Sequence, residues 1–369
     1  MASSRFHIYF LVLFATAIIL IPRITIANLH HQDHSPKNHI PLFVFGDSLF
    51  DVGNNNYLKN PIGLANFWPY GQTFFHHATG RFCDGRLISD FIAEYLKLPL
   101  ILPYLQPGNH QYTDGVNFAS GGAGALVETH QGNEGRVIDL KTQVIYLKNV
   151  KKHISKQIGD EETKELFSKA IYLISIGGND YMAPSDVFKS FSQEDYVGMV
   201  LGNLTSVIKD IYKIGGRNFG FVGMGAFDCA PNIKLLNKEK GSCNKEISSL
   251  IELHNTKLPN TLKEIKGQLQ EFQYVFFDFY TTLLERINNP SYFGFKEANV
   301  ACCGAGLYRG ILSSCGLVKG YEVCDNASEY VFFDSVHPTE KTYKQLAKLI
   351  WSGDHKVTMP YNLNTMVEA

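Results

Sequence analysis

Ser48 is the residue that best fits a catalytic nucleophile. It follows a short apolar run that breaks at Gly46, and in an open α/β sheet functional side chains gather beyond the carboxyl ends of the strands. A neutral serine attacks a carbonyl poorly unless an imidazole takes its proton and an acid orients that imidazole. Near the other end of the chain, Asp334 stands three residues before His337. Ser48, Asp334 and His337 therefore form a candidate triad for acyl transfer.

Each of these short motifs also has an ordinary structural interpretation. Asp and Ser side chains form local hydrogen bonds in turns, and Asp-x-x-His before Pro338 is typical of the start of a helix. The G-x-S-x-G elbow of α/β-hydrolases is absent around Ser48, which disfavours that fold. The triad hypothesis therefore depends on what else the chain places near these residues.

Two further segments offer donors for an oxyanion. A strand-like apolar run ends at Gly177, just before Asn179, and a glycine-rich turn contains Gly121 and Gly122. Backbone N–H groups and an Asn side-chain amide can both stabilise the negative oxygen that forms during acyl transfer. The turn has neither G-x-x-x-x-G-K-[ST] nor G-x-G-x-x-G spacing, which disfavours a phosphate cradle.

The pattern of apolar segments predicts the scaffold that positions these residues. Strands are expected at 41–45, 115–119, 171–176, 218–224 and 274–279, and helices at 86–97, 139–157, 161–169, 193–213, 244–271 and 339–351. Strands that alternate with helices indicate a mostly parallel sheet covered on both faces. His337 comes directly before the last of these helices.

The N-terminus has the features of a secretory signal peptide. Arg5 precedes the apolar run 8–21, and small residues near Ala27 offer a cleavage site. The run is shorter than the roughly 20 residues that span a bilayer, so no transmembrane anchor is expected. We expect residues 1–27 to be removed and residues 28–369 to form a single domain, with 28–39 disordered.

The cysteines and glycosylation motifs agree with export. Seven cysteines in an exported chain predict disulfides with at least one cysteine left over. Cys229 and Cys243 form a reasonable pair, and pairing is expected within a group whose connectivity stays open: Cys302, Cys303, Cys315 and Cys324. Zinc is disfavoured because C-x-x-C spacing is missing. Asn203 and Asn326 begin N-glycosylation motifs.

Six stretches resemble the SGNH hydrolases, and specifically the plant GDSL esterase/lipase family. They are FVFGDSLFDVGNNNYL (43–58), GRFCDGRLISDFIAEYLKLP (80–99), GVNFASGGAGAL (115–126), YLISIGGNDY (172–181), ACCGAG (301–306) and FFDSVHPTE (332–340). Flanking segments at 65–75 and 202–222 look most like the secreted, pathogen-responsive GDSL lipases of plants. The chain departs from the family pattern at Cys83, where serine is usual, and at 225–231.

The resemblance implies a three-layer α/β/α, flavodoxin-like SGNH hydrolase fold and a role for each matching residue. Ser48 would be the nucleophile and one oxyanion donor, Gly121 and Asn179 the other donors, His337 the base and Asp334 its orienting acid. The family glycine is placed at Gly121, with Gly122 as the alternative.

The function expected from these observations is that of a secreted serine esterase or lipase, in the apoplast or cell wall space. Its partner would be a small acyl ester or lipid, and no metal or organic cofactor is implied. Because 34 basic residues face 35 acidic ones without a basic tract, no nucleic-acid partner is expected. An acyltransferase that uses an alcohol acceptor is the main alternative, and a non-catalytic lipid- or carbohydrate-binding protein is a remote one.

Overall fold

The computed structural model describes residues 39–130, 136–184 and 190–369. Residues 39–369 form one compact unit. The expected signal peptide and residues 28–38 of the expected disordered stretch lie outside the described ranges. His39, the last residue of that stretch, is described, and its imidazole lies 2.9 Å from the Asp114 carboxylate.

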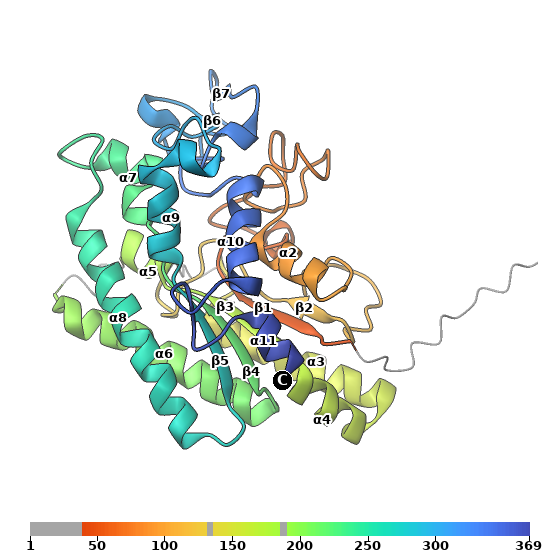
Figure 1. Ribbon diagram of the computed structural model, residues 1–369. Coiled ribbons are helices and arrows are strands. Elements are labelled where there is room, and N and C mark those ends of the chain that lie inside the picture. Colours follow the sequence, from red (N-terminus) through yellow and green to blue (C-terminus); the bar gives the residue numbers. More distant parts are fainter. Residues whose placement is uncertain (1–38, 131–135, 185–189) are drawn as a thin grey trace, which may run out of the picture. The chain divides into compact units, whose positions relative to one another are not determined.

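A central sheet of six strands runs through the described residues in the order β2-β1-β3-β4-β5-β8 (Figure 1). The strands are β1 (Leu42–Gly46), β2 (Gly115–Asn117), β3 (Ile171–Ser175), β4 (Asn218–Val222), β5 (Gln273–Phe277) and β8 (Thr358–Met359). Strands β1 to β5 are parallel, and β8 pairs antiparallel with β5. The order 2-1-3-4-5 is that of flavodoxin-like folds, in which ligands bind where the strand order reverses, between β1 and β3.

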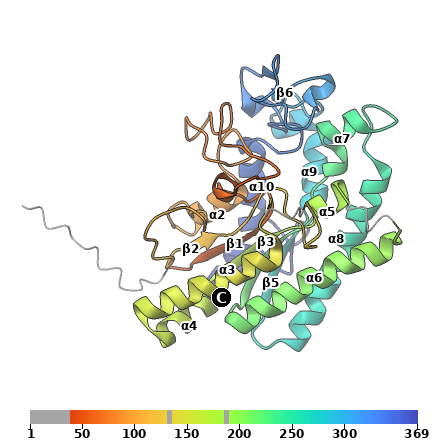
Figure 2. The ribbon, with the colours of Figure 1, turned by 180° about the vertical axis from the view of Figure 1, so that it is seen from behind.

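The strands are apolar on both sides because helices cover both faces of the sheet. Phe43 and Tyr172 belong to one buried cluster, whereas their neighbours Val44 and Leu173 belong to another. The first cluster includes side chains of α3 (Leu140–Ile158), α4 (Asp160–Lys169), α6 (Gln193–Ile214) and α8 (Lys245–Gln268); the second includes those of α2 (Ile88–Tyr95), α9 (Phe279–Asn288), α10 (Glu340–Ser352) and α11 (Leu363–Glu368). Figure 2 shows the face that α3, α4 and α6 cover. The predicted three-layer α/β/α fold is confirmed.

The predicted elements are present, with small differences at their ends. The helix expected at 244–271 ends three residues early, at Gln268. In the segment 274–279, β5 ends at Phe277 and Asp278 then caps α9 by accepting the Thr281 amide. Elements not predicted are short: α5 (Gly178–Met182), α7 (Pro231–Leu236), α11, β8 and the hairpin β6 (Cys303–Gly304) with β7 (Glu322–Val323). Single 3-10 turns are η1 (Asn54–Tyr57), η3 (Phe227–Cys229), η4 (Pro290–Phe293), η5 (Leu307–Arg309) and η6 (Ala327–Glu329).

Three disulfides link six of the cysteines. They join Cys229 to Cys243, Cys302 to Cys324 and Cys303 to Cys315. The predicted pair and the predicted pairing within the 302–324 group are confirmed, and the cysteine left over is Cys83, which is buried. Within the described residues, no helix is long and apolar enough to cross a membrane.

Candidate active site

The structure brings Ser48, His337 and Asp334 together in the order that a triad requires. The Nε2 atom of His337 lies 2.8 Å from the Ser48 Oγ. On its other side, Nδ1 lies 2.9 and 2.8 Å from the two oxygens of Asp334. His337 and Asp334 are buried, while Ser48 is partly accessible. A substrate can therefore reach the hydroxyl while water is largely kept from the acid and the imidazole.

Asp334 is held in place by three donors besides the imidazole. Its Oδ1 accepts the backbone amides of Val336 and His337, and its Oδ2 accepts the Tyr70 hydroxyl at 2.8 Å. Burial acts to raise the pKa of Asp334, but the charge of His337 and the hydrogen bonds from residues 336 and 337 hold it below its ordinary value. The carboxylate therefore stays charged and can orient the imidazole.

Sequence reasoning did not identify Tyr70, which lies 264 positions from Asp334. Its ring also packs edge-on against Phe333 at 5.4 Å between centroids. A single tyrosine in a loop carries no spacing signal, so only the folded chain reveals its contact with the acid.

The turn after β1 presents Ser48 through a close backbone contact. Gly46 has a φ of 151°, and a Cβ there would lie 2.2 Å from the Ser175 carbonyl oxygen, so only glycine fits. The Gln143 side chain accepts the Gly46 amide and donates to its carbonyl. Helix α3 thus holds the end of β1, and Ser48 leaves the sheet between β1 and β3.

The glycine-rich turn requires a correction to the predicted oxyanion donors. The Gly121 amide, which we expected to be a donor, is already bonded to the Asp51 carboxylate at 2.9 Å. By contrast, the amides of Gly122 and Ser48 donate to no acceptor in the part of the chain that the structure describes. Gly122, which the sequence left as the alternative, is therefore the better candidate.

Asn179 lies at the start of α5, directly after β3. Its Nδ2 donates to the Ala123 carbonyl at 2.9 Å, and an amide nitrogen carries a second hydrogen. The hydrogen that is bonded to Ala123 fixes the side chain against the glycine-rich turn. The second hydrogen is available to a ligand. Its neighbour Asp180 accepts the amides of Ala125 and Leu126, so the ends of β2 and β3 are joined beside Ser48.

Buried carboxylates organise the rest of the site. Asp51 accepts the amides of Gly53 and Asn54 as well as that of Gly121, and burial raises its pKa to about 6. Asp47, the neighbour of Ser48, accepts the Leu49 amide. Burial, with a smaller contribution from Asp180, raises the pKa of Asp47 to about 7, although the Leu49 amide and His337 act in the opposite direction.

A pocket of about 330 Å³ opens beside the triad. Its lining includes Asp334 and His337 and is otherwise mainly apolar, with Ile62, Leu64, Phe67, Phe82, Leu312 and Leu317 among its residues. The Phe82 ring stacks obliquely on the His337 imidazole at 5.0 Å between centroids. Such a lining suits an acyl chain better than a charged group.

The remaining predicted residues lie away from this pocket. Asn326 is exposed at the start of η6, where its side chain accepts the Ser328 amide. Asn203 is in the middle of α6 and donates to the Met199 carbonyl.

Asp228 lies close to the sulfur atoms of Cys229 and Cys243. These two cysteines form a disulfide, which offers no thiolate to a metal ion.

Comparison with known proteins identifies the family of the chain. The model of the family described as GDSL-like lipase/acylhydrolase matches residues 42–350. The chain is similar to GDSL esterase/lipase 2 of Arabidopsis thaliana, with 49% identity over 365 residues that cover 96% of each chain. It is also similar to the GDSL lipase of Tanacetum cinerariifolium, with 47% identity over 329 residues, or 89% of this chain and 87% of that one.

Proposed function

Because this chain belongs to the GDSL-like lipase/acylhydrolase family and is a carboxylic ester hydrolase, we propose that Ser48 is its nucleophile and that the reaction proceeds through an acyl-enzyme. The observation that carries the proposal is the continuous hydrogen-bond chain from Ser48 through His337 to Asp334. The family relationship implies a small-molecule ester as the substrate, and the apolar pocket supports one with an acyl chain.

In the first half-reaction, the Ser48 Oγ attacks the ester carbonyl carbon while its proton moves to the His337 Nε2. The imidazolium that results is paired with Asp334, whose charged state favours this transfer. The C–O bond of the ester then breaks, and the alcohol leaves with the proton from Nε2. The acyl group is now bonded to the Ser48 Oγ.

The negative oxygen of each tetrahedral intermediate is stabilised by three donors: the amides of Ser48 and Gly122 and the free hydrogen of the Asn179 side chain. All three are held before substrate binds, so little reorganisation is needed as charge develops. In the second half-reaction, His337 takes a proton from water, the hydroxide bonds to the acyl carbon, and Ser48 recovers its proton as the acid leaves.

We also propose that the protein is secreted through the segment 1–27 and carries glycans at Asn326 and Asn203. The three disulfides of the described residues support an oxidising compartment. Asn326 is the more accessible acceptor because it is exposed in a loop, whereas Asn203 is partly buried on a helix.

A panel of p-nitrophenyl esters of increasing chain length tests the proposed reaction. The secreted protein and Ser48→Ala are assayed side by side, with and without added alcohols. Release of free acid that depends on Ser48 supports hydrolysis. Predominant formation of a new ester in the presence of an alcohol would instead support the acyltransferase alternative, and no turnover of any ester would contradict both.

A further inference from the structure

Five large apolar side chains lie exposed on segments that line the active-site pocket or adjoin residues that line it. We call them the apolar rim: Trp68, Ile311, Leu312, Leu317 and Val318. Between 42% and 63% of each residue's surface is exposed. Single exposed apolar residues are common, but a cluster of this kind marks an interaction site.

The apolar rim is continuous with the pocket lining. Leu312 and Leu317 both line the pocket and remain more than half exposed. The segment that contains them lies against Trp68, because a Cβ on Gly316 would come within 2.4 Å of the Trp68 carbonyl oxygen. Exposed apolar side chains therefore belong to the same segment as the pocket lining, which extends to the side of His337.

The fold holds the apolar rim outward. The Cys303–Cys315 disulfide anchors its centre to β6, and the Ser314 carbonyl accepts the amides of both Leu317 and Val318. The Ser314 hydroxyl in turn accepts the Ala305 amide. The backbone that carries Leu317 and Val318 is therefore held at the surface by a disulfide and by hydrogen bonds.

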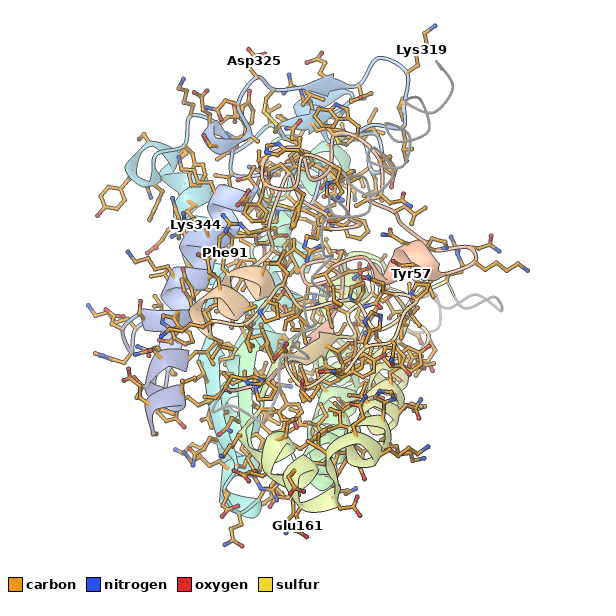
Figure 3. The ribbon with its side chains drawn as sticks, turned by 90° about the vertical axis from the view of Figure 1, so that its right-hand side faces the viewer. Tyr57, Phe91, Glu161, Lys319, Asp325 and Lys344 are labelled. Carbon is orange, nitrogen blue, oxygen red and sulfur yellow. A yellow bond between two sulfur atoms is a disulfide. The ribbon has the colours of Figure 1, made fainter. Side chains whose placement is uncertain are left out.

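Charged groups stand beside the apolar rim but not within it. The segment 310–318 has no charged residue, Arg309 is paired with Glu322 at 2.7 Å, and Lys319 follows at the outer end. Figure 3 shows Lys319 projecting from this end of the molecule, opposite the end that carries Glu161. An uncharged apolar surface with a cation at its border suits a lipid–water interface, where the apolar side chains are buried and the cation stays among the headgroups.

We propose that the apolar rim docks onto aggregated ester substrate at a lipid–water interface, so that an acyl chain enters the pocket without crossing water. This rests on the proposed function, since the pocket must receive an ester. A lipid surface fits better than a protein partner because the pocket opens through the rim. A protein bound there would close the pocket to its substrate, whereas lipid supplies that substrate.

The test uses Trp68→Gln/Val318→Gln, because neither residue lines the pocket, and Ile145→Gln as a control. Ile145 is an exposed apolar residue on α3, at the end of the molecule away from β6 and β7 (Figures 1 and 2). Binding to phosphatidylcholine vesicles is measured by co-sedimentation, with Ser48→Ala included in each protein to prevent turnover. Proteins with Ser48 intact are assayed in parallel on dissolved p-nitrophenyl butyrate.

The double variant should need roughly tenfold more lipid for half-maximal binding, with butyrate hydrolysis within twofold of the wild type and the control unchanged in both assays. The inference is overturned if the wild type does not bind vesicles, if the double variant binds equally well, or if gel filtration shows that the rim joins two copies. Failure of butyrate hydrolysis in the wild type would count against the proposed function instead, because vesicle binding requires no catalysis.

Discussion

The Ser48 Oγ and the His337 Nε2 lie 2.8 Å apart, although the two residues are 289 positions apart in the chain. Ser48 follows β1 and His337 precedes α10, so strands β2, β3, β4 and β5 and most of the helices lie between them in sequence. Their separation is therefore a property of the tertiary fold, and changes that loosen either end should lower activity before they unfold the protein.

Removing the Tyr70 hydroxyl should hold Asp334 less firmly in place, but Asp334 should still orient His337. In Tyr70→Phe, Asp334 keeps the amides of Val336 and His337. We therefore expect kcat to fall by no more than roughly 10- to 100-fold, because one hydrogen bond to a charged group is worth about 1.5–3 kcal/mol. Asp334→Asn should cost more, and His337→Ala most, because it removes the base itself. A Tyr70→Phe enzyme as inactive as His337→Ala would contradict this order.

Asn179→Ala should lower kcat by roughly 10²–10³ with little change in KM, the usual cost of one oxyanion donor. Steady-state kinetics on a dissolved ester measure both constants. The Asp180 contacts with residues 125 and 126 remain, so the turn should keep its shape. A change in KM alone would mean that Asn179 binds the substrate and not the transition state.

Asp47 should make the protein less stable as pH rises. Its pKa is about 7 in the folded state, against an ordinary value of 3.8, so the folded protein binds this proton more tightly than the unfolded chain. The resulting stability is fully present below about pH 4 and is lost as pH rises to about 7. The pH dependence that Asp334 contributes has the opposite sign. Because its pKa is lowered in the folded state, the stability that it provides is present at neutral pH and is lost only in acid.

Asp47→Asn tests this dependence, since an amide oxygen can still accept the Leu49 amide but cannot ionise. Thermal unfolding is measured between pH 4 and 8. The Tm of the variant should rise relative to the wild type as pH increases through this range. A difference in Tm that stays constant with pH would show that Asp47 does not titrate there.

The Cys303–Cys315 disulfide should support both stability and activity. Replacing both cysteines by serine removes a bridge of 12-residue separation, worth about 2–4 kcal/mol of unfolding free energy, and releases the pocket residues Leu312 and Leu317. Cys229→Ser/Cys243→Ser is the matched control, because neither cysteine lines the pocket. Both variants should have a lower Tm. At a temperature where both are folded, Cys303→Ser/Cys315→Ser should lose more activity than the control, and equal losses would contradict the link to the pocket.

The residues that we propose for the site and that lie in short local motifs could be named from the sequence. Ser48, Asn179 and the Asp334–His337 pair each follow a strand or precede a helix, and parallel topology brings such positions to one edge. The choice of Gly122 over Gly121 was not predictable, because it depends on which amide Asp51 accepts across 70 positions. The role of Tyr70 was missed because its contact with Asp334 spans 264 positions of the chain. Strand β8 was missed because two residues give no periodicity. The signal peptide and the glycans remain predictions.

Covalent labelling of the nucleophile tests the central claim most directly. A fluorophosphonate should react with the Ser48 Oγ, and peptide mass spectrometry should place the label there. Ser48→Ala should take up no label and lose at least about 10³-fold in kcat, with its Tm close to that of the wild type. Labelling at another residue, or a Ser48→Ala protein with nearly full esterase activity, would contradict the account.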